Sequence, residues 1–253
     1  MTIEYWNNQI QCFWHGNKLS LVELLTLKSF INNGYKVNLW RYDNRIDIDR
    51  PHGVEIRDAN EVIPQDKIFF YTGKGDCRAG SLGGFSDIFR YHLLYKFGGT
   101  YIDMDSVSLT PFNFDEFDYI IKPHIGCKTV GNLLKAPAGC DFLKSCIDET
   151  EKQIDKDNNS WVLPVKIFNT MVEKHNLQQY IVPVNYFGQD DPDVMYKAKN
   201  GRWLTDKQVL PKYVHHWCKE ASYGRWQYRE LYDWDKPKPL SIYYNLLAIN
   251  GLI

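Results

Sequence analysis

The sequence predicts a single α/β domain, and three observations support this fold class. The chain has 253 residues, which is enough to bury a substantial core within one domain. Apolar residues make up 44% of the sequence and charged residues 24%, as in ordinary soluble globular proteins. Strand-like and helix-like segments alternate from the N-terminus onward, without an internal repeat or a low-complexity linker.

The first forty residues predict a strand, a helix and a second strand. Residues 9–14 end in apolar and aromatic side chains before a His-Gly-Asn sequence, which predicts a strand that breaks into a loop. Ser20 and Glu23 have the spacing of a capping box, and the apolar stripe after them predicts a helix that Gly34 terminates. Residues 35–40 alternate as in a strand. This order is typical of α/β domains that bind nucleotides.

The next segments lead to a pair of acidic residues. Residues 54–57 predict a third short strand, and residues 71–85 are rich in glycine, so we expect a loop beside a ligand site. Ser86 is suited to cap a helix that the glycines at 98–99 would end, and residues 100–104 then predict a strand. Open α/β sheets bind ligands at the carboxyl ends of their strands, so we expect the acidic pair there to face a ligand.

The second half of the chain carries weaker signals. We expect helices over 140–154 and 165–175, a short strand over 180–184 and strand-like structure within 209–217. The tail, 237–253, is apolar and aromatic, so we expect it to pack on the body or to touch a partner or a membrane surface.

Charge and cysteine content narrow the functional classes. The net charge of -1 supplies no broad field for nucleic acid or an anionic membrane, so local groups must hold any anionic ligand. The six cysteines are scattered and form no C-x-x-C pair, which indicates reduced thiols rather than a zinc site or a disulfide scaffold. We find no signal-peptide pattern and no apolar run long enough to span a bilayer, so we expect a cytoplasmic protein, with the inner face of the membrane as an alternative.

Asp103 and Asp105 form a D-x-D triplet at the end of the strand predicted over 100–104. The two carboxylates can approach one cation if the chain turns there, and strand alternation would also point both side chains to one face. Such a pair suits Mg²⁺ or Mn²⁺, which take further ligands from substrate phosphates. A solvated turn is the alternative for an isolated triplet.

Asp87 and Arg90 lie three residues apart on one face of the predicted helix. They can form a surface ion pair. If the helix instead points its N-terminus at a ligand, Arg90 would favour an anion and Asp87 would accept hydrogen bonds from sugar hydroxyls.

The block from 85 to 105, FSDIFRYHLLYKFGGTYIDMD, resembles the D-x-D sugar-binding region of the family 32 glycosyltransferases. The resemblance extends to mannosyl- and galactosyltransferases of capsular polysaccharide synthesis and to the catalytic domains of glucosylating toxins. It implies a GT-A-like fold with a central mixed sheet flanked by helices, a donor-binding core at about 1–130 and an acceptor side with a closing segment at about 131–253. The equivalents of five residues bind donor sugar, phosphate or metal in that family: Asp87, Arg90, Tyr101, Asp103 and Asp105.

Further candidates lie near the N-terminus and in the stretch after the acidic pair. Phe13, Trp14 and His15 are similar to the strand-end motif with which these enzymes meet the nucleotide base; we expect Trp14 to stack on the base, with a core tryptophan as the alternative. The stretch 131–141 looks like the family's region after the metal motif, which makes Asn132 a candidate for sugar or acceptor contact.

A histidine pair and a Ser-Trp element near the C-terminus also resemble the family. His215 and His216 precede Ser222 and Trp226, and a histidine in this place commonly completes the metal site. Because strand alternation lets only one of the pair face the site, we expect His216 there, with a core histidine as the alternative. The spacing between the two elements is wider than in the family.

The resemblance implies a hexosyltransferase that uses Mn²⁺ or Mg²⁺ held by Asp103, Asp105 and His216. It also implies a nucleotide-sugar donor, with a UDP-sugar favoured, a hydroxyl acceptor on a glycan or glycolipid, and retention of configuration. The alternatives are an inactive relative that binds the nucleotide sugar and a metal-dependent hydrolase that splits it. We expect no nucleic acid ligand and see no sign of a protein partner; the tail is a candidate for peripheral membrane contact.

The residues that we assign to catalysis are Asp103, Asp105 and Arg90, and those that we assign to the donor are Phe13, Trp14, His15, Asp87, Arg90, Tyr101, Asp103, Asn132, Ser222 and Trp226.

Overall fold

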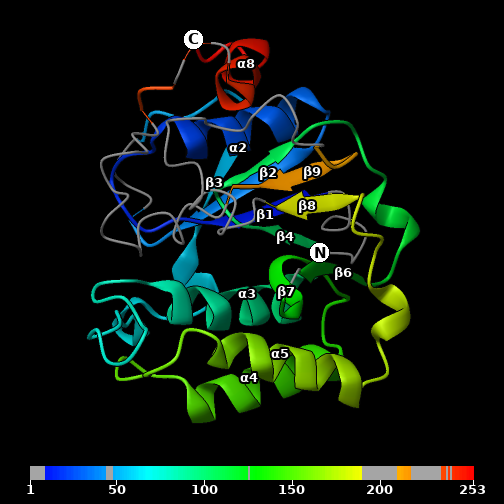
Figure 1. The fold of residues 1–253 in the computed structure, drawn as a ribbon. Helices are drawn as coiled ribbons and strands as arrows, with labels where there is room; N and C mark the ends of the chain where they lie inside the picture. The colour runs from blue at the N-terminus through cyan, green and yellow to red at the C-terminus, as the bar shows by residue number, and fades with distance from the viewer. Residues whose placement is uncertain are drawn as a thin grey trace.

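The computed structural model describes residues 9–43, 48–124, 126–189, 210–217, 235–237, 239 and 241–253. Within these residues, a six-stranded sheet has the order β3-β2-β1-β4-β7-β6 (Figure 1). Its strands are β1 (Gln9–Phe13), β2 (Lys36–Arg41), β3 (Val54–Asp58), β4 (Thr100–Ile102), β6 (Ile120–His124) and β7 (Lys128–Lys135). The first four strands run parallel, and β7 and β6 pair antiparallel, so the expected mixed sheet is confirmed.

A second, three-stranded sheet has the order β5-β9-β8. Its strands are β5 (Ser106–Ser108), β8 (Phe187–Gln189) and β9 (Val214–His216). Because β5 follows directly after the acidic pair and β9 carries the two histidines, this small sheet brings the C-terminal part of the chain to the D-x-D turn.

Helices cover both faces of the large sheet (Figure 1). They are α2 (Leu21–Asn32), α3 (Gly83–Phe97), α4 (Asp141–Gln153), α5 (Leu163–Lys174) and α8 (Ile242–Ile249), with short 3₁₀ turns η1 (Ala59–Glu61), η2 (Gln65–Lys67), η3 (Phe114–Glu116) and η4 (Gln178–Tyr180). One core lies between α2 and the sheet, and the other lies between the sheet and α3, α4 and α5. The result is a helix-sheet-helix arrangement in which α3 delivers the chain to β4.

The start of α2 and the start of α3 test the capping predictions. The Ser20 backbone N–H donates to Glu23 Oε2 at 2.7 Å, so the predicted capping box is present. The prediction that Ser86 caps α3 is wrong, because α3 begins at Gly83 and Ser86 lies inside it. The Gly83 N–H donates to Ser81 Oγ at 3.2 Å, which provides a hydrogen-bond partner one turn before Ser86.

The strand predicted over 180–184 is also wrong. Residues 178–180 form a 3₁₀ turn, and only an isolated bridge joins Ile181 to Ile121 of β6. Val182 donates one backbone hydrogen bond to Ile121, at 3.2 Å. Pro183 then has no N–H with which to continue the pairing.

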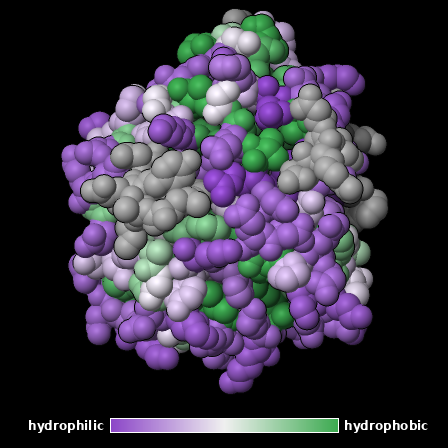
Figure 2. Space-filling view, turned by 180° about the vertical axis from the view of Figure 1, so that it is seen from behind, coloured by the Kyte–Doolittle hydropathy of each residue, from purple (hydrophilic) through white to green (hydrophobic). Residues whose placement is uncertain are grey.

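The C-terminal tail packs on the body through α8. Tyr243 and Leu247 are buried against Val22 and Leu25 of α2, which confirms that part of the tail prediction. Ile249 lies on the other side of α8 and is 77% exposed. Figure 2 shows apolar surface at the top of the molecule, where Figure 1 places this helix. No helix in the described part of the chain combines the length and the apolar character needed to cross a membrane.

Candidate active site

The turn between β4 and β5 brings the two D-x-D carboxylates together. Asp103 follows the last residue of β4, and its N–H donates to the Asn132 carbonyl at 2.9 Å. Asp105 precedes β5, and its carbonyl accepts from the Trp217 N–H at 2.8 Å. The chain therefore turns within the triplet, and backbone bonds to β7 and to the end of β9 hold each side of the turn.

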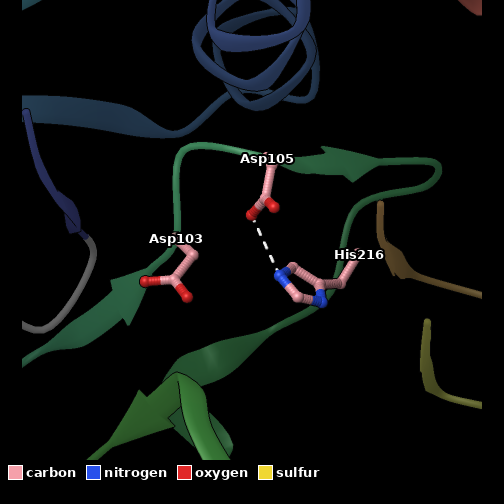
Figure 3. Close-up of side chains that lie close together, drawn as sticks. All are labelled: Asp103, Asp105 and His216. Atoms are coloured by element: carbon pink, nitrogen blue, oxygen red, sulfur yellow. Dashed lines mark ion pairs between the residues drawn. The ribbon is translucent and has the colours of Figure 1, made fainter. Parts of the chain in front are cut away.

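His216 joins this pair from β9. Ser106 of β5 lies opposite His216 in the antiparallel register, which places the imidazole beside Asp105. His216 Nε2 lies 2.9 Å from Asp105 Oδ1, and one ligand atom from each of Asp103, Asp105 and His216 lies within 4.8 Å of the others. Figure 3 shows the three side chains pointing toward a common space.

The neighbouring histidine is placed differently. His215 is 1% exposed, and its ring packs on the edge of Trp217 with the ring centroids 4.6 Å apart. Strand alternation sends the two side chains to opposite faces of β9. The structure thus brings His216, and not His215, to the acidic pair.

Arg90 of α3 connects the acidic pair to the helix. Its Nη1 lies 3.0 Å from Asp87 Oδ1, and its Nη2 lies 3.0 Å from Asp103 Oδ1. The guanidinium also sits over the ring of Tyr101, 4.9 Å from the centroid. Arg90 is buried, so the surface ion pair considered for Asp87 and Arg90 is instead a buried bridge between two carboxylates.

Burial and charge set the protonation of this bridge. Burial raises the pKa of Asp87 to about 6, and the Arg90 guanidinium opposes the shift. Burial likewise raises the pKa of the Asp103 carboxyl, with Arg90 opposing the shift and Asp105 adding to it. Three carboxylates and one guanidinium leave two negative charges here when His216 is neutral. A divalent cation matches that charge.

Gly131 of β7 is a site residue that the sequence reasoning did not single out. A Cβ at this position would lie 3.1 Å from Arg90 Nη1 and 3.4 Å from Arg90 Cδ. The missing side chain therefore leaves room for the guanidinium. A glycine inside a strand is the available signal, because it often marks the close approach of another group.

Asn132, the next residue of β7, lies beside Asp103. Its side chain is buried, and among the described residues its Oδ1 has no hydrogen-bond partner. A buried acceptor of this kind calls for a donor from elsewhere, since leaving it unpaired costs about 1–3 kcal/mol.

The three residues of the aromatic motif at the end of β1 differ in burial. The Phe13 ring is buried and stacks on Phe89 with the centroids 4.2 Å apart, so this side chain contributes to packing. Trp14 is half-buried, whereas His15 is exposed and its ring lies 5.5 Å from that of Phe70. Ser222 and Trp226 lie outside the described residues.

Comparisons with known proteins agree with this geometry. A family model described as "Glycosyltransferase sugar-binding region containing DXD motif" matches residues 78–123. No curated protein sequence matches the chain. The apo-form glycosyltransferase GlyE of Streptococcus pneumoniae TIGR4 superposes with a TM-score of 0.50 at 15% identity, over 97% of this chain and 64% of GlyE, which is less than two thirds of that protein.

Two other solved structures are also similar. PaToxG glycosyltransferase superposes with a TM-score of 0.45 at 12% identity, over 99% of this chain and 90% of that one. The galactosyltransferase LgtC, solved with donor and acceptor sugar analogues, has a TM-score of 0.42 at 11% identity, over 83% of this chain and 87% of LgtC. Residues 78–123 thus match a DXD-containing sugar-binding region, and they lie within a mixed α/β fold similar to that of the glycosyltransferase GlyE.

Proposed function

We propose that this chain transfers a sugar from a nucleotide-sugar donor, a UDP-sugar first and a GDP-sugar second, to a hydroxyl of a glycan or glycolipid. The observation that carries the proposal is the convergence of Asp103, Asp105 and His216 at the carboxyl end of β4. Retention of configuration rests on the family resemblance.

The three side chains fit a divalent cation. Carboxylate oxygens suit both Mg²⁺ and Mn²⁺, and an imidazole in the set favours Mn²⁺, since Mg²⁺ prefers oxygen ligands. Asp103 would hold the cation with a carboxylate oxygen, while Arg90 Nη2, 3.0 Å from Asp103 Oδ1, keeps the carboxylate in place. When bound, the cation would stabilise the leaving nucleoside diphosphate.

The surrounding residues have separate tasks in this proposal. Arg90, seated over Tyr101, holds Asp103 in place and contributes positive charge next to an anionic donor. Asp87 and Asn132 supply acceptor oxygens for sugar hydroxyls, and the Asn132 side chain would have to turn outward to do so, because its Oδ1 is buried. Trp14 is the candidate surface for the base.

In this proposal, different regions of the chain bind the donor and the acceptor. Residues 1–130 bind the donor, and residues 131–253 supply the acceptor side and the closing segment. Within the closing segment we assign Ser222 and Trp226 to the donor by resemblance.

Calorimetry tests the donor site directly. UDP, GDP and CMP, with their common sugars, are titrated with Mn²⁺ and with excess chelator. We expect one nucleotide to bind in a metal-dependent way and Asp105→Asn to abolish that binding. Asp148→Asn is the matched control, because Asp148 is an exposed acid on α4. Binding that persists in Asp105→Asn would contradict the metal site, and product analysis with and without sugar acceptors separates transfer from hydrolysis.

A further inference from the structure

Trp161 is a large aromatic side chain that the proposed donor site does not use. It lies in the loop between α4 and α5 and is 52% exposed. Burying an indole is strongly favourable, so an ordered tryptophan left half in solvent often marks a contact surface.

The loop that carries Trp161 is fixed to the glycine-rich loop before α3. The Trp161 N–H donates to Asp76 Oδ1 at 2.8 Å, and the Asp76 N–H donates back to the Asn159 carbonyl at 3.1 Å. The Thr72 N–H also donates to the Lys156 carbonyl, at 2.8 Å. These reciprocal bonds hold the backbone of Trp161 in one position.

Gly75 and Asn158 tighten the junction between the loops. Gly75 has a φ of +59°, and a Cβ there would lie 1.9 Å from the Asn159 oxygen, so only glycine allows this approach. The buried side chain of Asn158 donates to the Ser160 carbonyl at 2.7 Å. The backbone around Trp161 is therefore held in place before a ligand binds, which reduces the entropy lost on binding.

The topology places Trp161 at the same edge of the sheet as the D-x-D turn. A helix that leads into a parallel strand begins near the carboxyl ends of the strands, so the loop before α3 lies at this edge. Figure 1 shows that loop and the α4–α5 loop on the same side of the molecule. Tyr71 links the glycine-rich loop to α3, since a Cβ on Gly84 would lie 2.2 Å from the Tyr71 hydroxyl.

The surroundings of Trp161 suit a neutral sugar better than a lipid surface or an anion. The partly exposed ion pair of Lys74 and Asp157, 3.2 Å apart, lies on the same pair of loops. A pyranose can lay its C–H face on the indole while its hydroxyls meet polar groups of this kind. Membrane contact would require a contiguous apolar patch, whereas these two loops carry a charged pair.

We propose that Trp161 is a stacking platform for a pyranose ring of the acceptor, an inference that rests on the transferase function proposed above. This acceptor subsite is separate from the donor site. The α4–α5 loop forms it, and the glycine-rich loop supports it.

The test compares Trp161→Ala and Trp161→Phe with wild type in two independent assays. An array of pyranose oligosaccharides is probed with each protein in the presence of UDP and Mn²⁺, and sugars that bind are then used as acceptors in transfer kinetics. Donor binding and hydrolysis of the UDP-sugar by water are measured separately. Ile249→Ala is the matched control, because Ile249 is an exposed apolar residue on α8.

We expect Trp161→Ala to raise the acceptor KM about tenfold to a hundredfold, as for the loss of one aromatic stacking contact, and to leave donor hydrolysis unchanged. Trp161→Phe should keep most of the acceptor affinity. An unchanged acceptor KM in Trp161→Ala overturns the proposal, as does a wild type that hydrolyses donor but retains no sugar on the array. Trp161-dependent binding to phosphatidylcholine vesicles instead of sugars also overturns it. If sugar retention depends on Trp161 but no nucleotide binds, the saccharide platform is supported and the transferase function is refuted.

Discussion

Replacing Arg90 by methionine should destabilise the fold strongly at neutral pH. Methionine keeps much of the stem of Arg90 but removes the charge that pairs with Asp87 and Asp103, each 3.0 Å from a separate guanidinium nitrogen. Breaking a fully buried ion pair by removing one partner costs about 3–5 kcal/mol, and we expect the lower end of this range because the Asp87 and Asp103 side chains are 23% and 26% exposed. Against a total stability of about 5–15 kcal/mol, that cost is large. Arg90→Lys keeps one charge but loses the fork, so we expect a smaller loss of about 1.5–3 kcal/mol.

The pH dependence of this loss identifies its cause. Asp87 has a folded-state pKa of about 6, above its ordinary value of 3.8, so the folded state binds the extra proton and its stability falls as pH rises through this window. Without Arg90 the pKa of Asp87 rises further, which extends the window upward. Arg90→Met should therefore differ from wild type most at pH 8 and less at pH 5.

Urea unfolding followed by circular dichroism at the two pH values measures the effect. Asp87→Asn combined with Arg90→Met should recover part of the lost stability, because the unpaired carboxylate is then absent. A loss below about 1 kcal/mol at pH 8 would refute the buried-bridge reasoning, given the range expected for such a pair. An equal loss at both pH values would show that the carboxylates are not the cause.

Four more substitutions separate the parts of the site. Gly131→Ala places a methyl group 3.1 Å from the guanidinium of Arg90, so we expect a cost of about 1–3 kcal/mol by urea unfolding, together with slower transfer; unchanged kinetics would contradict its positioning role. Gly75→Ala places its Cβ 1.9 Å from a backbone oxygen of the facing loop, and we expect a higher acceptor KM with unchanged donor hydrolysis; equal losses in both assays would argue against a separate acceptor platform. His216→Ala should weaken Mn²⁺ binding in calorimetry with little change in Tm, whereas His215→Ala should lower the Tm by removing a buried ring; the reverse pattern would exchange their roles.

The sequence predicts the position of the acidic pair because the signals that lead to it are local. A helix, a glycine stop and a strand precede Asp103 within about twenty residues, and each has its own propensity. Strand alternation likewise separates His215 from His216 once β9 is assigned.

The errors arise where residues outside the predicted helix decide where it starts and what it buries. α3 starts early because Ser81 provides a hydrogen-bond acceptor, and Arg90 is buried because β7 presents a glycine to it. Neither fact can be read from the helix alone. The exposed position of Trp161 depends in the same way on a pairing of two loops about eighty residues apart.

The contacts within the acidic site also indicate what would have to change if the proposed cation binds. Arg90 holds only one oxygen of Asp103, at 3.0 Å, so that contact can persist while the other oxygen turns to the cation. His216 Nε2 lies 2.9 Å from Asp105 Oδ1, a separation that two neighbouring ligands of one octahedral cation can keep, so binding would require the loss of any shared proton and no large movement. β9 is the central strand of the small sheet and pairs with β5 and with β8 through three residues each, while Arg90 bridges Asp87 and Asp103 on the other side of the site. Both sides of the proposed cation site are therefore held by contacts that would persist when a cation binds.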